Sequence, residues 1–100
     1  RENSRAMTIQ VTRVEFTSAP PKLRSTGLVG WLVVTLDGAL RLDSLALRRT
    51  TGGQLTVAFP SRRDRRGRDH PYVRPLDDVT RREFERQVLA HLAPTAGVKP

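Results

Sequence analysis

The sequence has no cysteine and no long apolar run. The absence of cysteine excludes disulfides and thiolate metal sites, and it is compatible with a reducing cytoplasm. The longest apolar run, residues 28–36, has the length of a strand and is far shorter than a membrane span. We therefore expect a cytoplasmic protein without a membrane segment.

Side chains that commonly carry catalysis or bind metals are also scarce. The chain has two histidines, His70 and His91, which lie far apart in the sequence. Ser61 precedes His70, but no nucleophile motif surrounds it. The scattered aspartates show no metal-ligand spacing. We expect no enzymatic activity, no cofactor, no metal site and no small-molecule substrate.

Positive charge, by contrast, is abundant. Lys+Arg number 18 against 10 for Asp+Glu, which gives a formal net charge of +8. Nearly all of the basic residues are arginines, whose planar guanidinium suits bidentate recognition of phosphate. This balance favours a polyanionic partner. The alternative is an arginine-rich, solvated surface that has no specific ligand.

The strongest chemical signal lies in residues 54–81. Apolar alternation over residues 55–59 predicts a strand, which Pro60 ends because proline cannot donate to a ladder. A basic loop then follows, with Gly67 where a tight turn fits, and a helix begins after it. We interpret the loop arginines as phosphate-binding residues: Arg62, Arg63, Arg65, Arg66 and Arg68.

Three further strands are expected, over residues 8–16, 27–37 and 39–49, with a loop at residues 17–26. The alternation changes phase near Thr12–Arg13 and again near Ser44, as a β-bulge would cause. Asp37–Gly38 is a hairpin signal, and a turn at residues 51–53 leads into the strand at 55–59.

The last expected element is a helix over residues 81–93. Phe84, Val88 and Leu92 recur at four-residue spacing and predict its buried stripe. Thr80 and Glu83 fit a capping box at its start.

These elements predict an α+β fold: a small antiparallel sheet of four to five strands in a meander, followed by one C-terminal helix packed on the sheet. We expect a single domain over residues 8–93. Residues 1–7 are interpreted as an N-terminal extension or a cloning remnant, and residues 94–100 as a flexible tail.

The strand at 27–37 is apolar on both faces. One face can pack on the helix, whereas Val29, Trp31 and Val33 on the other face need a different cover. In so small a chain a second subunit is the usual cover. We therefore predict a homodimer with these three residues at its interface.

Arg81 is expected to point toward the end of the sheet, because it lies three positions before Phe84. There it would meet Arg62 and Arg63 in a composite basic site that Arg82 completes. The alternative for Arg81 is an ion pair with Asp77 or Asp78. With few aromatic residues available for base stacking, contact with a duplex backbone is favoured over recognition of single strands.

An ordered set of short segments resembles the stage V sporulation protein G family, the small septation regulators of bacteria. The segments run from Val11 to Val14, from Thr35 to Asp37 and from Ala58 to Arg63, followed by Gly67, Arg74–Pro75 and Thr80–Arg81.

This resemblance covers most of the chain and implies a role in septation, cell division or sporulation. It also implies site-selective binding of DNA, with RNA as a second possibility. An alternative of a different class is a structural or protein-interaction dimer module that binds no specific nucleic acid.

Overall fold

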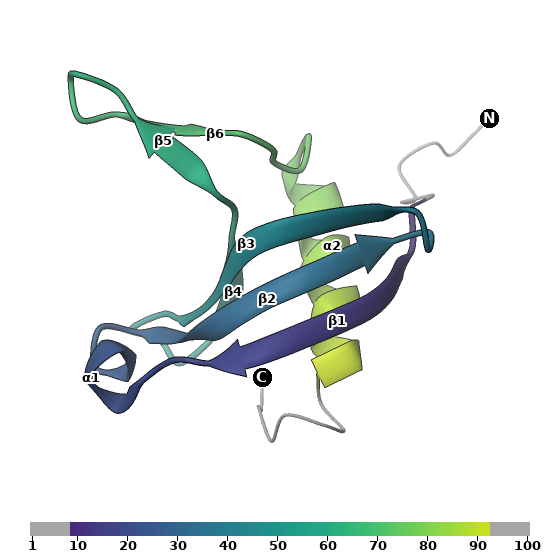
Figure 1. Ribbon diagram of the computed structural model, residues 1–100, viewed down its shortest axis with the longest axis horizontal. Helices are drawn as coiled ribbons and strands as arrows, with labels where there is room; N and C mark the ends of the chain where they lie inside the picture. Colours follow the sequence, from purple (N-terminus) through teal and green to yellow (C-terminus); the bar gives the residue numbers. More distant parts are fainter. Residues whose placement is uncertain (1–8, 93–100) are drawn as a thin grey trace.

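The computed structural model describes residues 9–92, and it has an α+β fold (Figure 1). Four strands form an antiparallel sheet in the order β1-β2-β3-β4, so the predicted meander is confirmed. A separate two-stranded hairpin, β5–β6, projects from this sheet, and one long helix crosses its back. The elements are β1 (Val11–Ser18), α1 (Pro21–Arg24), β2 (Leu28–Leu36), β3 (Leu40–Arg49), β4 (Leu55–Ala58), β5 (Ser61–Arg63), β6 (Asp69–Pro71) and α2 (Asp78–Leu92).

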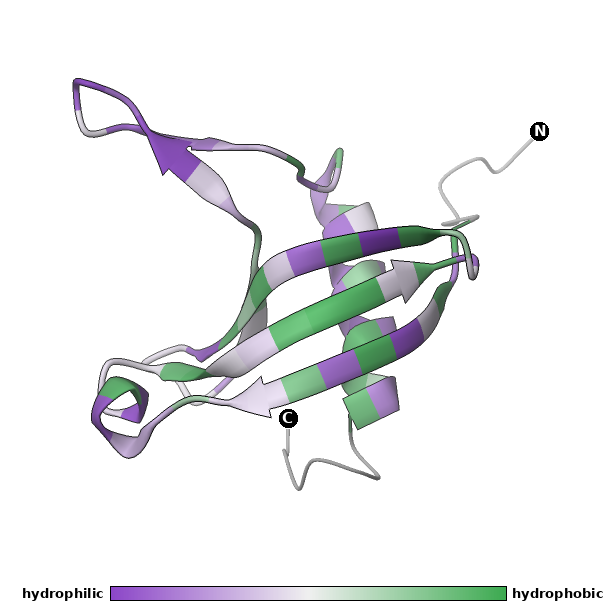
Figure 2. Cartoon of the chain, in the orientation of Figure 1, coloured by the Kyte–Doolittle hydropathy of each residue, from purple (hydrophilic) through white to green (hydrophobic). Residues whose placement is uncertain are grey.

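The hydrophobic core lies between the sheet and α2. Alternate residues of β2, among them Leu32 and Val34, are buried, as are Leu45 and Leu47 of β3. The predicted helix stripe is confirmed, because its three members are buried against these strands: Phe84, Val88 and Leu92. Figure 2 shows the hydrophobic β2 at the centre of the sheet and the hydrophilic β5–β6 hairpin outside it. The core therefore fixes α2 on one face, and the described residues leave the other face of the sheet uncovered.

Both predicted phase changes coincide with irregularities in the sheet. The β1–β2 register shifts between Val11 and Arg13, and the β2–β3 register shifts between Leu32 and Val34, opposite Ser44. Ser44 has a φ of 64°, in the left-handed region. An extra residue in one strand returns the following side chains to the core face, which is why the alternation restarts there.

The segment expected to be a loop, residues 17–26, is partly ordered into regular structure. β1 continues to Ser18, and Pro21–Arg24 forms one helical turn, α1. Proline suits the first position of a helix because its φ is already helical. The first strand itself begins at Val11, later than expected, and Thr8 lies outside the described residues.

The expected capping box is wrong, because Asp77 caps the helix. Its Oδ1 accepts a hydrogen bond of 2.9 Å from the amide of Thr80, and its carbonyl accepts one of 3.0 Å from the amide of Arg81. An aspartate is among the strongest N-cap residues, so α2 begins at Asp78, ahead of the expected start. Glu83 turns instead toward Arg86 and Gln87. Residue 93 and the expected tail at 94–100 lie outside the described residues.

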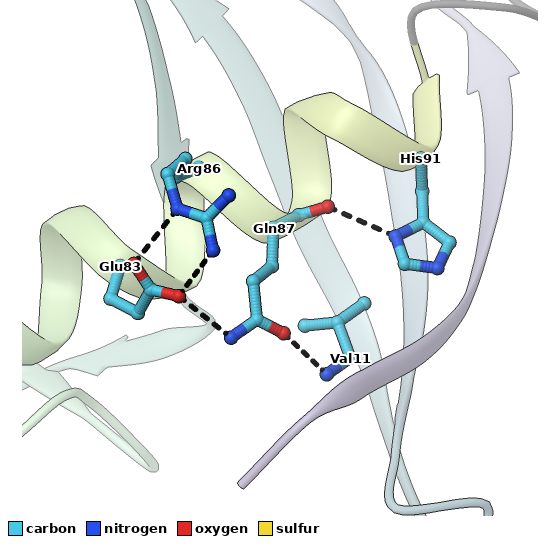
Figure 3. Close-up of polar contacts among 5 residues, drawn as sticks. All are labelled: Val11, Glu83, Arg86, Gln87 and His91. Carbon is cyan, nitrogen blue, oxygen red and sulfur yellow. Dashed lines mark hydrogen bonds and ion pairs between the residues drawn. The ribbon is translucent and has the colours of Figure 1, made fainter. Parts of the chain in front are cut away.

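Polar side chains of α2 also accept hydrogen bonds from backbone amides of both edge strands, β1 and β4. The buried Gln87 accepts a hydrogen bond of 2.7 Å at Oε1 from the amide of Val11 in β1 (Figure 3). Its Nε2 donates to Glu83, which in turn binds Arg86. At the other edge, Glu85 accepts a hydrogen bond of 3.0 Å from the amide of Val57 in β4. These bonds occupy backbone groups that an edge would otherwise leave unpaired.

Replacing Gln87 by leucine should lower the free energy of unfolding by about 1–3 kcal/mol, because the amide of Val11 would remain buried without an acceptor. Urea unfolding measures this change. Arg82→Ala on the same helix is the control, since Arg82 is exposed, and a surface change of this kind is expected to shift stability by less than about 0.5 kcal/mol. Equal effects of the two substitutions would contradict the role given to Gln87.

Acid should weaken the Glu83 contacts. Hydrogen bonds from Arg86 first, and then from Gln87, lower the pKa of Glu83 to about 2. The stability that this lowered pKa contributes is present above about pH 4.5 and is lost as the pH falls toward about 2. We expect the urea midpoint of wild type to fall more steeply over this range than that of Glu83→Gln. Identical pH profiles would contradict this assignment.

No helix within residues 9–92 is long and apolar enough to cross a membrane.

Candidate nucleic-acid interface

The basic segment is an ordered hairpin, not the flexible loop expected. β5 and β6 pair antiparallel, with Arg62 opposite His70 and Arg63 opposite Asp69. β4 ends at Ala58, one residue before the expected end, and the carbonyl of Pro60 accepts a hydrogen bond of 2.9 Å from the amide of Tyr72. The two arms therefore close just beyond the sheet. In Figure 1 the hairpin stands clear of the four-stranded sheet.

Asp64 organises the tip of this hairpin. Its Oδ1 accepts hydrogen bonds from the amides of Arg66 and Arg68, at 2.8 and 3.0 Å. Its Oδ2 lies 2.6 Å from Nε2 of His70, across the hairpin. Gly67 adopts a φ of 81°, which glycine tolerates without strain, as expected for a tight turn. The hydrogen bond from His70, and then that from the amide of Arg68, lower the pKa of Asp64.

The role of Asp64 was not predicted from the sequence, which was interpreted here by its arginines and by Gly67. A stronger signal was present, since Asp64 and Gly67 occupy the first and fourth positions of a four-residue segment. Aspartate first and glycine fourth is typical of a type I turn.

Most of the predicted phosphate-binding arginines lie exposed on this hairpin. Arg63 is paired, because its Nε lies 3.4 Å from Oδ1 of Asp69. The remaining ones make no ion pair within residues 9–92: Arg62, Arg65, Arg66 and Arg68. The turn uses backbone amides and the Asp64 carboxylate, so it leaves these four guanidinium groups available to a ligand.

Arg81 is not grouped with Arg62 and Arg63. It lies 3.8 Å from Asp78 and 3.9 Å from Glu85, so the ion-pair alternative with Asp78 describes its surroundings. A cleft between the hairpin and the start of α2 contains Arg81 among side chains of both signs. Its charged lining residues are Asp69, Arg74, Asp77, Asp78 and Arg81. This mixed lining does not extend the basic surface of the hairpin. Arg82 is exposed on the helix, without an ion pair in the described part of the chain.

The face of the sheet opposite α2 carries the three residues predicted to contact a second subunit. Val29 and Val33 are half-buried, and Trp31 is 39% exposed. Trp31 and Val33 line an open groove that Glu15 and Asp43 flank. Val29 also packs against the core cluster, and the homodimer stays a prediction.

Within residues 9–92, no cluster of three or more His, Cys, Asp or Glu side chains is placed to hold a metal ion. His70 contacts Asp64, and Nδ1 of His91 lies 3.0 Å from the carbonyl oxygen of Gln87. Each described histidine thus has a local structural contact.

No protein-family model matches the chain, and a search of curated proteins finds no significant match. The resemblance to the stage V sporulation protein G family therefore remains a prediction that rests on the residues quoted for it.

Proposed function

We propose that this chain is a homodimeric regulatory protein that binds the phosphate backbone of nucleic acid through the β5–β6 hairpin. The observation that carries the proposal is the set of exposed arginines on this hairpin that have no carboxylate partner within residues 9–92: Arg62, Arg65, Arg66 and Arg68. Binding of a polyanion by such side chains releases counterions, which is the main driving force for contacts to a nucleic-acid backbone.

The order of the hairpin strengthens the proposal. A guanidinium on a paired strand or a hydrogen-bonded turn loses less backbone freedom on binding than one on a mobile loop. Asp64 provides this order while using only amides of the turn and the ring of His70. Contacts of this kind fix the position of a backbone and do not read its sequence.

Duplex DNA is the favoured ligand, and RNA is the second possibility. Tyr72 is 70% exposed just after β6 and is the one tyrosine of the chain. One exposed tyrosine beside the arginines offers little surface for stacking several unpaired bases. A regulatory role in septation or sporulation in the bacterial cytoplasm rests on the family resemblance alone.

The proposed homodimer uses the uncovered sheet face around Val29, Trp31 and Val33. Pairing through this face would place two hairpins at a fixed separation, as symmetric DNA-binding proteins do. The same exposed Trp31 favours the second candidate, an interaction module in which the dimer is the function. Sedimentation equilibrium of wild type and Trp31→Ala tests the dimer. A wild-type monomer at micromolar concentration would contradict it.

Fluorescence anisotropy tests nucleic-acid binding, with a mixed-sequence duplex DNA pool and a single-stranded RNA pool at low and near-physiological salt. We expect binding of the duplex that weakens steeply as salt rises. Absence of binding to both pools at low salt would contradict the proposed function and favour the interaction module. Tighter binding of RNA than of duplex would contradict the preference for a duplex.

A further inference from the structure

One end of the four-stranded sheet is built mainly from two segments that contain no acidic residue. Segments 16–36 and 44–63 contain six basic residues and no aspartate or glutamate. The fold brings parts of both segments together, because α1 contacts β2 and Leu28 at the start of β2 pairs with Arg48 near the end of β3. We call three of the basic side chains at this end the cationic end: Lys22, Arg24 and Arg48.

Neutral acceptors hold the two arginines of the cationic end. Arg24 donates from Nε to the carbonyl of Ala19 at 3.0 Å and from a terminal nitrogen to Oγ of Ser18 at 2.6 Å. Arg48 donates to the carbonyl of Thr26 at 3.1 Å. Because these acceptors carry no charge, they position the guanidinium groups without neutralising them. Lys22 is exposed on α1.

Three arginines elsewhere on the sheet and on α2 lie beside carboxylates. Arg13 pairs with Glu15, Arg41 with Asp43, and Arg86 with Glu83. The opposite end of the sheet carries Asp37, whose carboxylate accepts a hydrogen bond from the amide of Gln10. The opposite end of the sheet therefore carries a carboxylate, whereas the cationic end carries three basic side chains.

The cationic end lies on the same side of the molecule as the β5–β6 hairpin. In Figure 1 both α1 and the hairpin appear at the left, whereas the turn between β2 and β3 lies at the right. A rigid polyanion that contacts the hairpin can therefore extend toward α1. The longest dimension of the protein is 47 Å, which a duplex of about 20 base pairs exceeds, at 3.4 Å per base pair.

We propose that Lys22, Arg24 and Arg48 form a second phosphate-binding surface, which contacts the backbone of the same nucleic acid that the hairpin binds. This inference rests on the proposed function and adds a second contact region to it. An anionic membrane is a less suitable ligand. Insertion into lipid needs an exposed apolar face, and α1 has four residues, of which Leu23 is half-buried.

The test measures the slope of log K against log salt for a labelled duplex of about 20 base pairs. The variant carries Lys22→Gln, Arg24→Gln and Arg48→Gln. Each lost phosphate contact should lower the magnitude of the slope by about 0.9, so three lost contacts should lower it by about 2.7. The control Arg13→Gln, Arg41→Gln and Arg86→Gln removes the same charge from arginines that have carboxylate partners, and its slope should stay close to that of wild type.

A second variant separates charge from loop structure. Arg24→Lys with Arg48→Lys keeps the charges but changes the hydrogen bonds to Ala19 and Thr26, and it should retain most of the wild-type slope. Loss of the slope in this variant, with circular dichroism unchanged, would overturn the inference in favour of a structural role for these arginines.

The remaining outcomes separate the two proposals. The slope could stay unchanged in the glutamine variant while hairpin substitutions reduce it. That result would overturn phosphate binding by the cationic end and leave the proposed function of the hairpin intact. Wild type that binds no duplex would overturn both. The glutamine variant could also lose binding to vesicles of phosphatidylserine and phosphatidylcholine that wild type binds, while its duplex binding stays unchanged. That result would overturn the inference in favour of a lipid surface.

Discussion

Replacement of Arg65, Arg66 and Arg68 by glutamine is expected to weaken duplex binding by about 10²–10³-fold at about 0.1 M salt. The estimate follows from the salt dependence of phosphate contacts, which gives roughly an eightfold loss per contact at this salt concentration. These three side chains are exposed at the hairpin tip, and the turn itself depends on Asp64 and on the backbone amides of Arg66 and Arg68. The substitutions should therefore remove charge without removing the hairpin. Fluorescence anisotropy measures the affinity.

The control for this loss is a variant with the same decrease in net charge. Arg13, Arg41 and Arg86 each lie beside a carboxylate, so their replacement by glutamine should change affinity far less. If both triple variants lose affinity equally, the protein acts as a diffuse positive charge. The hairpin would then have no special role.

The second large effect is expected in the core. Leu47 in β3 is fully buried in the cluster that the sheet forms with α2. Leu47→Ala should lower the free energy of unfolding by about 2–5 kcal/mol, because it removes buried methyl groups and leaves a cavity. Urea unfolding measures this loss. It is a large part of the about 5–15 kcal/mol that typically stabilises a small domain.

Leu40 in the same strand provides the matched control. It is 59% exposed, so Leu40→Ala should change stability by less than about 0.5 kcal/mol. A comparable loss in both variants would contradict the difference in burial between Leu47 and Leu40.

Local patterns in the sequence were sufficient to predict the sheet and the helix. Side chains alternate across a strand, so the burial of alternate β2 residues and of the helix stripe could be predicted from the positions of the apolar residues. The interruption at Ser44 was predictable for the same reason, because a bulge moves the following residues to the other phase.

Features that depend on contacts between distant residues were missed. Gln87 is polar, so the sequence alone would place it on the surface. It is buried, and its Oε1 accepts a hydrogen bond from the amide of Val11, which is distant in the sequence. The pairing of β5 with β6 adds few buried apolar contacts and leaves no periodic signal. The sequence did not show which carboxylates surround Arg81, and the structure places its guanidinium near Asp78 and Glu85.

The most direct test of the central claim is an NMR titration that follows the Nε–Hε signals of the arginine side chains during addition of duplex DNA. We expect the signals of Arg62, Arg65, Arg66 and Arg68 to shift, and those of the acid-paired Arg13, Arg41 and Arg86 to stay unchanged. Shifts confined to the uncovered sheet face, with the Trp31 indole moving and the hairpin signals fixed, would contradict phosphate binding by the hairpin.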